Sequence, residues 1–403
     1  MSLLPEALSV RDYVRSLLQR LSFDCDFEWR PLPEVRRDAP VSYSAEDGGQ
    51  NVRKLRTYSV VSAKAWGAGF PTDGRPVYVQ RGFVGVMIPQ GLDPSSRLRL
   101  YRQVLELEVA DLATVKGGLV LFDGTPPMKW GKVGAKTSWD ESLSLAAKVM
   151  IKGSDAIKDL TDVSCSDSSA ECALHMIESS NKRPFSGRAL LRLAAKGLID
   201  EYVLGPDPRH SWILALESLE RFYMFRKTVE DVWSKGSIPV FLVKTSRSTS
   251  FCRSSLPDVH VIEYALRSQG VLGPGYTIAR VYNNIYEYFG LKPSHSSLYP
   301  DAGGLRSFYE NRIGVISMFI RLRPGGYIFK AEVVFDNSSE RSPDQLVNDV
   351  LTYLSRIPLS PEGYPLPLVT ADYNARLSET EMEAVLRALG LDLVPESRSV
   401  LKV

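Results

Sequence analysis

The chain has 403 residues, which at about 150 residues per domain is enough for two or three structural units. With 44% hydrophobic and 24% charged residues, the composition is that of a globular protein, so wholesale disorder is excluded. The 49 basic and 47 acidic side chains nearly cancel, which excludes a tail-like polyanion binder but not a locally basic groove.

Cysteine usage and hydropathy give three further expectations. Four cysteines are too few for a disulfide framework, and without a CxxC pair a zinc site at Cys165, Cys172 and His175 is disfavoured. Proline and charged residues interrupt the first 21 residues, so no signal peptide is expected. No apolar run approaches the ~20 residues of a membrane span. The sequence therefore predicts a cytoplasmic protein with no membrane contact.

The first part of the chain has the pattern of a helix followed by strands. An amphipathic helix is expected over residues 8–21. A Pro- and Arg-rich connector follows, and two strand-like stretches come next, at Leu55–Trp66 and Val77–Ile88. The second of these alternates with a period close to two, which is typical of a half-buried strand.

A helix and a central strand are expected after these stretches. Ser95 and Ser96 can cap a helix that runs to about Thr114. The continuous apolar run Leu119–Phe122 predicts a buried central strand. The apolar stripe that predicts the buried face of the helix consists of Leu98, Tyr101, Leu105 and Leu112.

The second part of the chain alternates between helical and strand patterns. Residues 140–235 have helical periodicity, and strand character resumes at Ile238–Val243. A hairpin is expected over 313–335, with one helix from Pro343 and a last helix over Glu379–Leu389 behind a capping box. The fold class is therefore α/β: a mixed sheet flanked by helices. Residues 1–139 and 236–403 form the two parts of the sheet domain, and 140–235 form a mostly helical insertion.

Common catalytic motifs are absent from the sequence. No GxxxxGK[ST] loop is present, and the glycines at 270, 273 and 275 have the wrong spacing for a dinucleotide fingerprint. No GxSxG motif is present, which disfavours a serine hydrolase with a nucleophile elbow.

Three carboxylates remain as candidates for chemistry. Asp123 follows the LVLF strand directly, and Asp47 precedes two glycines and a long strand. Glu106 lies seventeen positions before Asp123 on the preceding helix, where it competes with Glu108. Carboxylates that converge from two strands and a helix are what a pair of divalent cations requires, because hard cations prefer anionic oxygen ligands.

Four short motifs occur in order along the chain and resemble those of one known family. They are EDGGQNVRKLRTYSVVSAKAWG (46–67), the Glu106 helix followed by LVLFDGT (119–125), FLVKTSRS (241–248) and GYPLPLVTADYNARLS (363–378). Together they resemble the NurA family of archaeal and bacterial DNA-end-processing nucleases, over nearly the whole chain.

This resemblance implies both a fold and an activity. The fold would be an RNase H-like sheet with an inserted helical region. The activity would be manganese-dependent (or magnesium-dependent) 5′→3′ exonuclease and single-strand endonuclease cleavage with two ions, acting on single-stranded DNA and duplex ends. The resemblance further implies a homodimer that docks on a HerA-type hexameric translocase in recombinational repair. Asp47, Glu106 and Asp123 become the metal-binding acids, and Tyr364 becomes the active-site tyrosine.

The sequence departs from the family pattern at Asp372, where the family has a histidine as a further metal ligand. Aspartate is also a competent oxygen ligand for manganese or magnesium, so Asp372 is taken as the fourth metal ligand. Two alternatives stay open. One is a degenerate adaptor that binds the translocase and DNA without cleavage, and the other is an RNase H-like module acting on RNA.

Basic side chains give candidate DNA contacts. Arg53, Lys54, Arg56 and Lys244 could contact the phosphate backbone, as could a face formed by Arg97, Arg99 and Arg102. The helix at 8–21 and the hairpin at 313–335 also suggest apolar surface beyond what one sheet needs, which favours a symmetric dimer.

Overall fold

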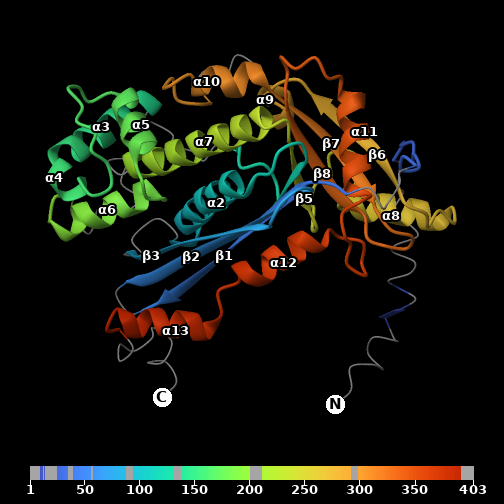
Figure 1. Cartoon of the computed structure of the whole chain (residues 1–403), viewed down its shortest axis with the longest axis horizontal. Helices are drawn as coiled ribbons and strands as arrows, with labels where there is room; N and C mark the ends of the chain where they lie inside the picture. Colours follow the sequence, from blue (N-terminus) through green and yellow to red (C-terminus); the bar gives the residue numbers. More distant parts are fainter. Residues whose placement is uncertain are drawn as a thin grey trace.

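The computed structural model describes residues 10, 11, 13, 25–34, 40–55, 58–87, 94–129, 138–199, 211–291 and 298–391. Within them, eight strands form one mixed sheet in the order β3-β2-β1-β4-β5-β8-β7-β6 (Figure 1). The strand β1 is parallel to β4, and β4 is parallel to β5, whereas the other neighbours are antiparallel. This architecture confirms the predicted α/β fold with a mixed sheet. The strands are β1 (Tyr43–Lys54), β2 (Ser59–Phe70), β3 (Val77–Met87), β4 (Leu119–Asp123), β5 (Ile238–Val243), β6 (Gly275–Tyr282), β7 (Ile313–Arg321) and β8 (Phe329–Asp336).

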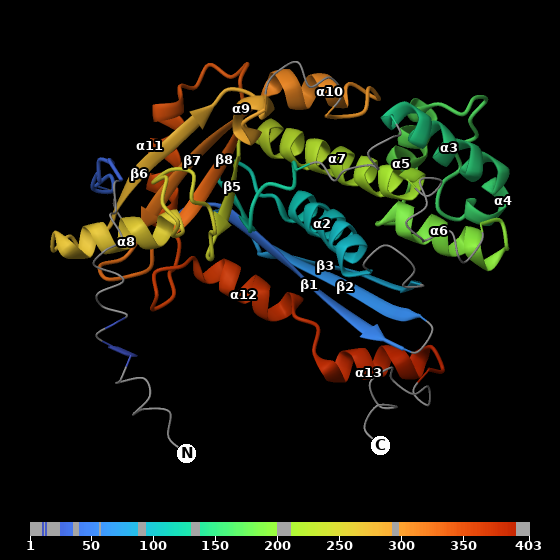
Figure 2. The ribbon, with the colours of Figure 1, turned by 180° about the vertical axis from the view of Figure 1, so that it is seen from behind.

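Helices cover both faces of this sheet. Helices α2 (Pro94–Ala113) and α7 (Ser211–Ser234) lie on one face, and α12 (Leu366–Ala375) lies on the other (Figures 1 and 2). Helix α11 (Pro343–Leu354) shares its apolar core with the same face as α12. The strands β4 and β5 contribute buried side chains to both cores, which explains their continuous apolar sequences.

The regular secondary structure described between β4 and β5 is entirely helical. In Figure 2 the shorter ones gather at one end of the molecule, around the far end of α7. This matches the helical periodicity of that stretch, while the division of the chain into domains stays a prediction. The shorter helices are α3 (Trp139–Lys152), α4 (Ser154–Ile157), α5 (Ala170–Ser179) and α6 (Phe185–Ala195).

Helix α2 has the expected buried stripe except at its end. Leu98, Tyr101 and Leu105 are buried, but Leu112 is 48% exposed, so that part of the prediction is wrong. An α-helix has 3.6 residues per turn, so residues that are seven positions apart in the sequence are offset by about 20° around the helix axis. The stripe therefore continues through Val109 instead.

The first strand of the sheet, β1, was not among the expected strands. The Asp47-Gly48-Gly49 segment, predicted to precede a strand, lies inside the twelve-residue β1. Glycine usually weakens a strand interior, so the local pattern pointed to a turn. The two long strands expected next are present as β2 and β3.

The hairpin β7–β8 is confirmed, as are the helix from Pro343 and the capping box that begins α13 (Glu379–Ala388). All nine residues of β7 are buried between its neighbours, so the hairpin does not provide the apolar surface expected for a dimer. Most of the helix predicted over 8–21 lies outside the described residues. Among the described helices, none is long and apolar enough to cross a membrane.

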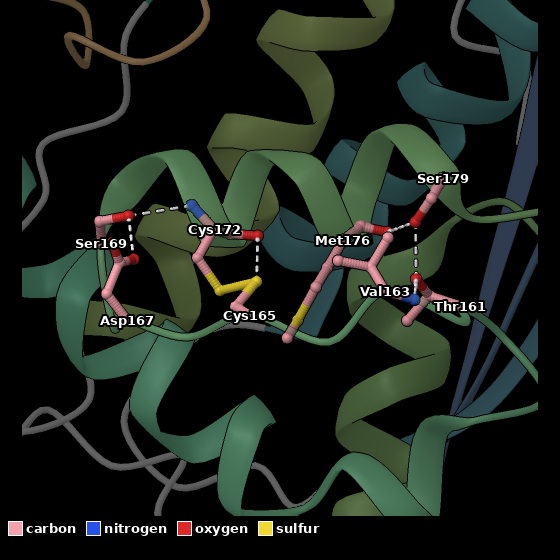
Figure 3. Close-up of a disulfide and its surroundings, with 8 residues drawn as sticks. All are labelled: Thr161, Val163, Cys165, Asp167, Ser169, Cys172, Met176 and Ser179. Atoms are coloured by element: carbon pink, nitrogen blue, oxygen red, sulfur yellow. Dashed lines mark hydrogen bonds between the residues drawn. A yellow bond between two sulfur atoms is a disulfide. The ribbon is translucent and has the colours of Figure 1, made fainter.

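All four cysteines form disulfides, which corrects the expectation drawn from their number. Cys25 binds Cys252 across 227 positions, and Cys165 binds Cys172 across 7. Figure 3 shows the second bond joining the Ser-rich segment to the first turn of α5, where Ser169 accepts from the backbone N–H of Cys172. The long-range pair could not be read from spacing, because only the fold brings its Cα atoms to 4.6 Å.

The predicted basic face on α2 is also corrected. Arg97 is only 4% exposed and forms a buried ion pair with Glu217 of α7. Its Nε donates to Glu217 at 2.9 Å, and its Nη2 donates to the Tyr101 hydroxyl at 3.0 Å. Arg97 therefore joins two helices and is not available to DNA.

Candidate active site

The parallel strands β1 and β4 bring Asp47 and Asp123 together at the edge of the sheet where their ladder ends, although β1 itself continues to Lys54. The parallel ladder ends at the pair Glu46–Phe122, so the next residue of each strand is an aspartate. Side chains alternate along a strand, and the two aspartates therefore leave the sheet on the same face. That face is the one covered by α12.

Asp123 is held by a tyrosine and a lysine. The Tyr364 hydroxyl donates to Asp123 Oδ1 at 3.2 Å, and Lys244 Nζ lies 2.9 Å from Oδ2. The same Lys244 nitrogen lies 4.6 Å from the centroid of the Tyr364 ring. Burial and the charge of Asp123 raise the pKa of Tyr364, so its hydroxyl stays protonated and acts as a donor.

Glu106 approaches from the opposite face on α2. Its Oε1 lies 2.9 Å from Arg102 Nη1, yet it is buried and accepts no hydrogen bond among the described residues. The Arg102 nitrogen instead donates to the carbonyl oxygen of Gly48 at 2.9 Å. Glu108 pairs with Arg81 of β3 at 3.1 Å. Of the two competing glutamates, Glu106 is the one whose charge interacts with Asp47 and Asp123.

Glu46 is a fourth carboxylate at this edge, and sequence reasoning missed it. It is 2% exposed, and its Oε2 has no hydrogen-bond partner among the described residues. Burial, followed by the charges of Glu106, Asp47 and Asp123, raises its pKa well above the usual range. The Glu-Asp pair in the sequence was the available signal. Adjacent residues of a strand face opposite sides of the sheet, however, so the choice of Asp47 argued against Glu46 as part of the same site.

Asp47 experiences the repulsion of the whole group. Burial, then the charges of Asp123 and Glu106, raise its pKa to about 7, although the Gly48 N–H donates to it at 2.7 Å. Like charges that crowd in this way favour either protonation or a bound cation.

The two glycines after Asp47 let helices approach β1 from both faces. A Cβ on Gly48 would lie 2.3 Å from Glu106 Oε1, and one on Gly49 would lie 2.1 Å from the carbonyl oxygen of Ala375 in α12. The glycines that made the segment look like a turn therefore position α2 and α12 around the carboxylates.

Gly49→Ala should destabilise the protein by about 1–3 kcal/mol, the usual cost of overpacking, because the clash is with backbone that cannot rotate away. Gly82→Ala on β3 is the matched control, since its Cβ would have no neighbour closer than 3.7 Å. Thermal denaturation of both variants checks this. Equal melting of the two would contradict the close approach of α12.

Asp372 lies on α12 beside the group. It pairs with Arg376 at 2.6 Å, one turn further along the helix. Its charge contributes to the raised pKa values of Asp47 and Tyr364, so it lies within electrostatic reach of both.

The residues predicted to contact DNA lie in different environments. Arg53 pairs with Glu379 of α13 at 2.5 Å, and Lys244 is held by Asp123. Lys54 is exposed, and Arg56 lies outside the described residues.

The carboxylates fit a hard divalent cation by chemistry, although they are not arranged around one. In the described part of the chain, no three Asp, Glu, His or Cys side chains form a group that could hold an ion. Lys244, Arg102 and Arg376 instead hold three of the carboxylates separately. Glu46 Oε2 and Glu106 Oε1 are buried and accept no hydrogen bond from the described residues, and carboxylate oxygens are the ligands that manganese and magnesium prefer.

A cavity of about 610 Å³ adjoins the carboxylates between the sheet, α2 and α7. Glu46, Glu106 and Asp123 line it, together with three basic residues. These are Arg99, Lys129 and Arg221, in addition to the Arg102 already described.

Comparison with known proteins places this arrangement in context. The family model of the NurA domain matches residues 42–377. The DNA double-strand break repair nuclease NurA of Saccharolobus solfataricus is 22% identical over 352 residues, which are 87% of this chain and 81% of that protein.

Solved structures share the fold. The crystal structure of the NurA nuclease from Sulfolobus solfataricus has a TM-score of 0.59 at 18% identity, over 97% of this chain and 96% of that one. A crystal structure of NurA bound to dAMP and manganese has a TM-score of 0.53 at 15% identity, over 100% and 97%. The family match contains every strand of the sheet and the carboxylates of the candidate site, from Glu46 to Asp372. This chain therefore belongs to the NurA family.

Proposed function

We propose that this chain is a DNA nuclease that requires manganese or magnesium. The observation that carries the proposal is the gathering of Glu46, Asp47, Glu106 and Asp123 at one sheet edge. Burial and the neighbouring negative charges raise the pKa of three of them, Glu46, Asp47 and Glu106. Buried carboxylates that crowd together cost free energy unless cations offset their charge. The relative with manganese and dAMP in its crystal structure supports the same chemistry.

In this proposal Asp47, Glu106, Asp123 and Asp372 would hold two ions, and the Glu46 carboxyl would lie beside them. When bound, such ions activate water and stabilise the leaving oxygen of a phosphodiester. Tyr364 keeps its proton and orients Asp123 through their hydrogen bond. Lys244, once released from Asp123, is placed to contact the phosphate of the substrate.

The finer features of the function rest on the family resemblance. They are 5′→3′ exonuclease and single-strand endonuclease cleavage in end resection, an RNase H-like nuclease domain split by the 140–235 insertion, a homodimer, and docking on a HerA-type hexameric translocase. On this chain, the edge strand β3 supports the homodimer, because large apolar side chains are exposed along it. They are Val77, Tyr78, Val84 and Val86.

Asp372→Ala should lower manganese affinity and cleavage by about 10–100-fold, since it removes one anionic donor from the edge of the site. The fold should persist, because the side chain lies on the outer part of α12. Asp372→His should retain or increase cleavage, because it restores the family pattern. The measurements are manganese titration calorimetry and release of nucleotides from a 5′-labelled DNA strand.

A second candidate function is an adaptor that binds DNA and the translocase without cleavage. The observation that favours it is the pairing of Asp123, Glu106 and Asp372 with cations of the same chain. This candidate predicts no manganese-dependent cleavage by the wild type and unchanged DNA binding by Asp372→Ala, so the same experiment decides between the two.

A further inference from the structure

Arg221 of α7 is a buried cation that the proposed metal chemistry does not use. It is 6% exposed and lines the 610 Å³ cavity beside the carboxylates. Its Nη2 donates to the carbonyl oxygen of Lys129 at 2.7 Å, and its guanidinium lies 4.7 Å from the Phe222 ring. Its Nε is buried and has no hydrogen-bond partner among the described residues.

The charge of Arg221 is not neutralised by a carboxylate in the described part of the chain. Burial, with a contribution from the positive charge of Arg99, lowers its pKa to about 10. Arg97, the other buried arginine between α2 and α7, differs because Glu217 pairs with it. A buried charge without a counter-ion costs free energy, and a bound anion would offset that cost at Arg221.

Other basic residues line the cavity together with Arg221. Arg99 and Lys129 line it as well, and both are exposed to solvent. Ser218, one turn before Arg221 on α7, adds a buried hydroxyl to the same lining. A volume of 610 Å³ is within the range of about 300–1,000 Å³ that small-ligand sites occupy, and it is enough for a nucleotide.

We propose that Arg221, assisted by Arg99 and Lys129, binds a phosphate group of the DNA strand whose neighbouring phosphodiester lies at the carboxylates. This inference rests on the proposed nuclease function and deepens it by naming the residues that position the strand. The planar guanidinium presents paired N–H donors that match phosphate oxygens, and this geometry suits arginine better than lysine. The cavity has basic residues at Arg221 and acidic residues at the carboxylates. One phosphate of the strand would therefore lie at Arg221, and the neighbouring phosphodiester would lie at the carboxylates.

The test measures, by fluorescence anisotropy, how tightly the full chain binds a fluorescein-labelled single-stranded oligonucleotide in the presence of EDTA. Without divalent metal there is no cleavage, so the result does not depend on the metal site. Arg221→Gln should weaken binding by about tenfold. The slope of log affinity against log salt should also become shallower by about 0.7, because one phosphate contact is lost.

Arg226→Gln is the matched control on the same helix. Arg226 binds the carbonyl oxygen of Gly303 and pairs with Glu230, away from the cavity, so its variant should bind DNA like the wild type. If Arg221→Gln does not fold, the double variant Arg99→Gln/Lys129→Gln replaces it, because both side chains are exposed. Affinities and salt slopes equal to those of Arg226→Gln would overturn the proposal.

Two oligonucleotides distinguish the source of the phosphate. If Arg221→Gln loses affinity only for the 5′-phosphorylated strand, the bound group is the terminal phosphate. If it loses affinity equally for the 5′-hydroxyl strand, the bound group is an internal phosphate, and both results support the site. Failure of the nuclease proposal is separate: it is the absence of manganese-dependent cleavage by a wild type that still binds DNA through Arg221.

Discussion

Asp123→Asn should reduce manganese-dependent release of nucleotides from DNA by more than about 100-fold. Residues that only support a metal ligand, and a ligand such as Asp372 at the border of the site, are expected to cost about 10–100-fold when they are replaced. Asp123 is expected to be a ligand at the centre of the carboxylates, so its replacement should cost more. The charge of its carboxylate acts on Asp47, Glu46 and Glu106, and the carboxylate accepts a hydrogen bond from the Tyr364 hydroxyl. Asparagine preserves the size and one acceptor oxygen, so the loss would come from the missing charge.

Glu108→Gln is the control for this experiment, because Glu108 is a carboxylate of α2 that pairs with Arg81 outside the group. It should retain wild-type cleavage. Strands labelled at the 5′ or the 3′ end report the direction of cleavage, and an RNA strand tests the alternative substrate. Equal activity of wild type and Asp123→Asn would place the chemistry elsewhere or in a contaminant.

Arg97→Met should destabilise the protein by about 3–5 kcal/mol, the usual result of removing one partner of a buried ion pair. The change leaves Glu217, which is 1% exposed, without its counter-ion between α2 and α7. Urea denaturation followed by tryptophan fluorescence measures the effect.

The double variant Arg97→Met/Glu217→Leu should recover most of this loss, because replacing both partners by apolar residues of similar size is often neutral. The hydroxyl of Tyr101, which also binds Glu217, would then account for the remaining cost. A single variant as stable as the wild type would mean that water reaches this pair.

The elements predicted correctly are those whose signals are local. The strand at Ile238–Val243 follows from a short continuous apolar run, and α13 follows from the capping box of Ser378 and Glu381. The hairpin β7–β8 follows from a Pro-Gly-Gly turn between two apolar stretches. In each case the residues that determine the element lie inside it or directly next to it in the sequence.

The candidate site was predicted in part for the same reason. Asp123 directly follows a buried strand, so its place at the sheet edge can be derived from neighbouring residues. Glu46 could not be identified, because its importance depends on Glu106 and Asp123 arriving from elsewhere in the chain. The separate pairing of the carboxylates with Lys244, Arg102 and Arg376 likewise exists only in three dimensions.

The sequence by itself determined the α/β class and the helical stretch between β4 and β5, because periodicity is a local property, and it nominated Asp47, Glu106 and Asp123 as the candidate site. Tertiary structure alone decided that Asp47-Gly48-Gly49 lies within a strand, since the close approach of α2 and α12 makes those glycines necessary. It also decided that Arg97 is buried against Glu217 and that Cys25 meets Cys252. These outcomes depend on contacts between residues distant in sequence, which local patterns do not specify.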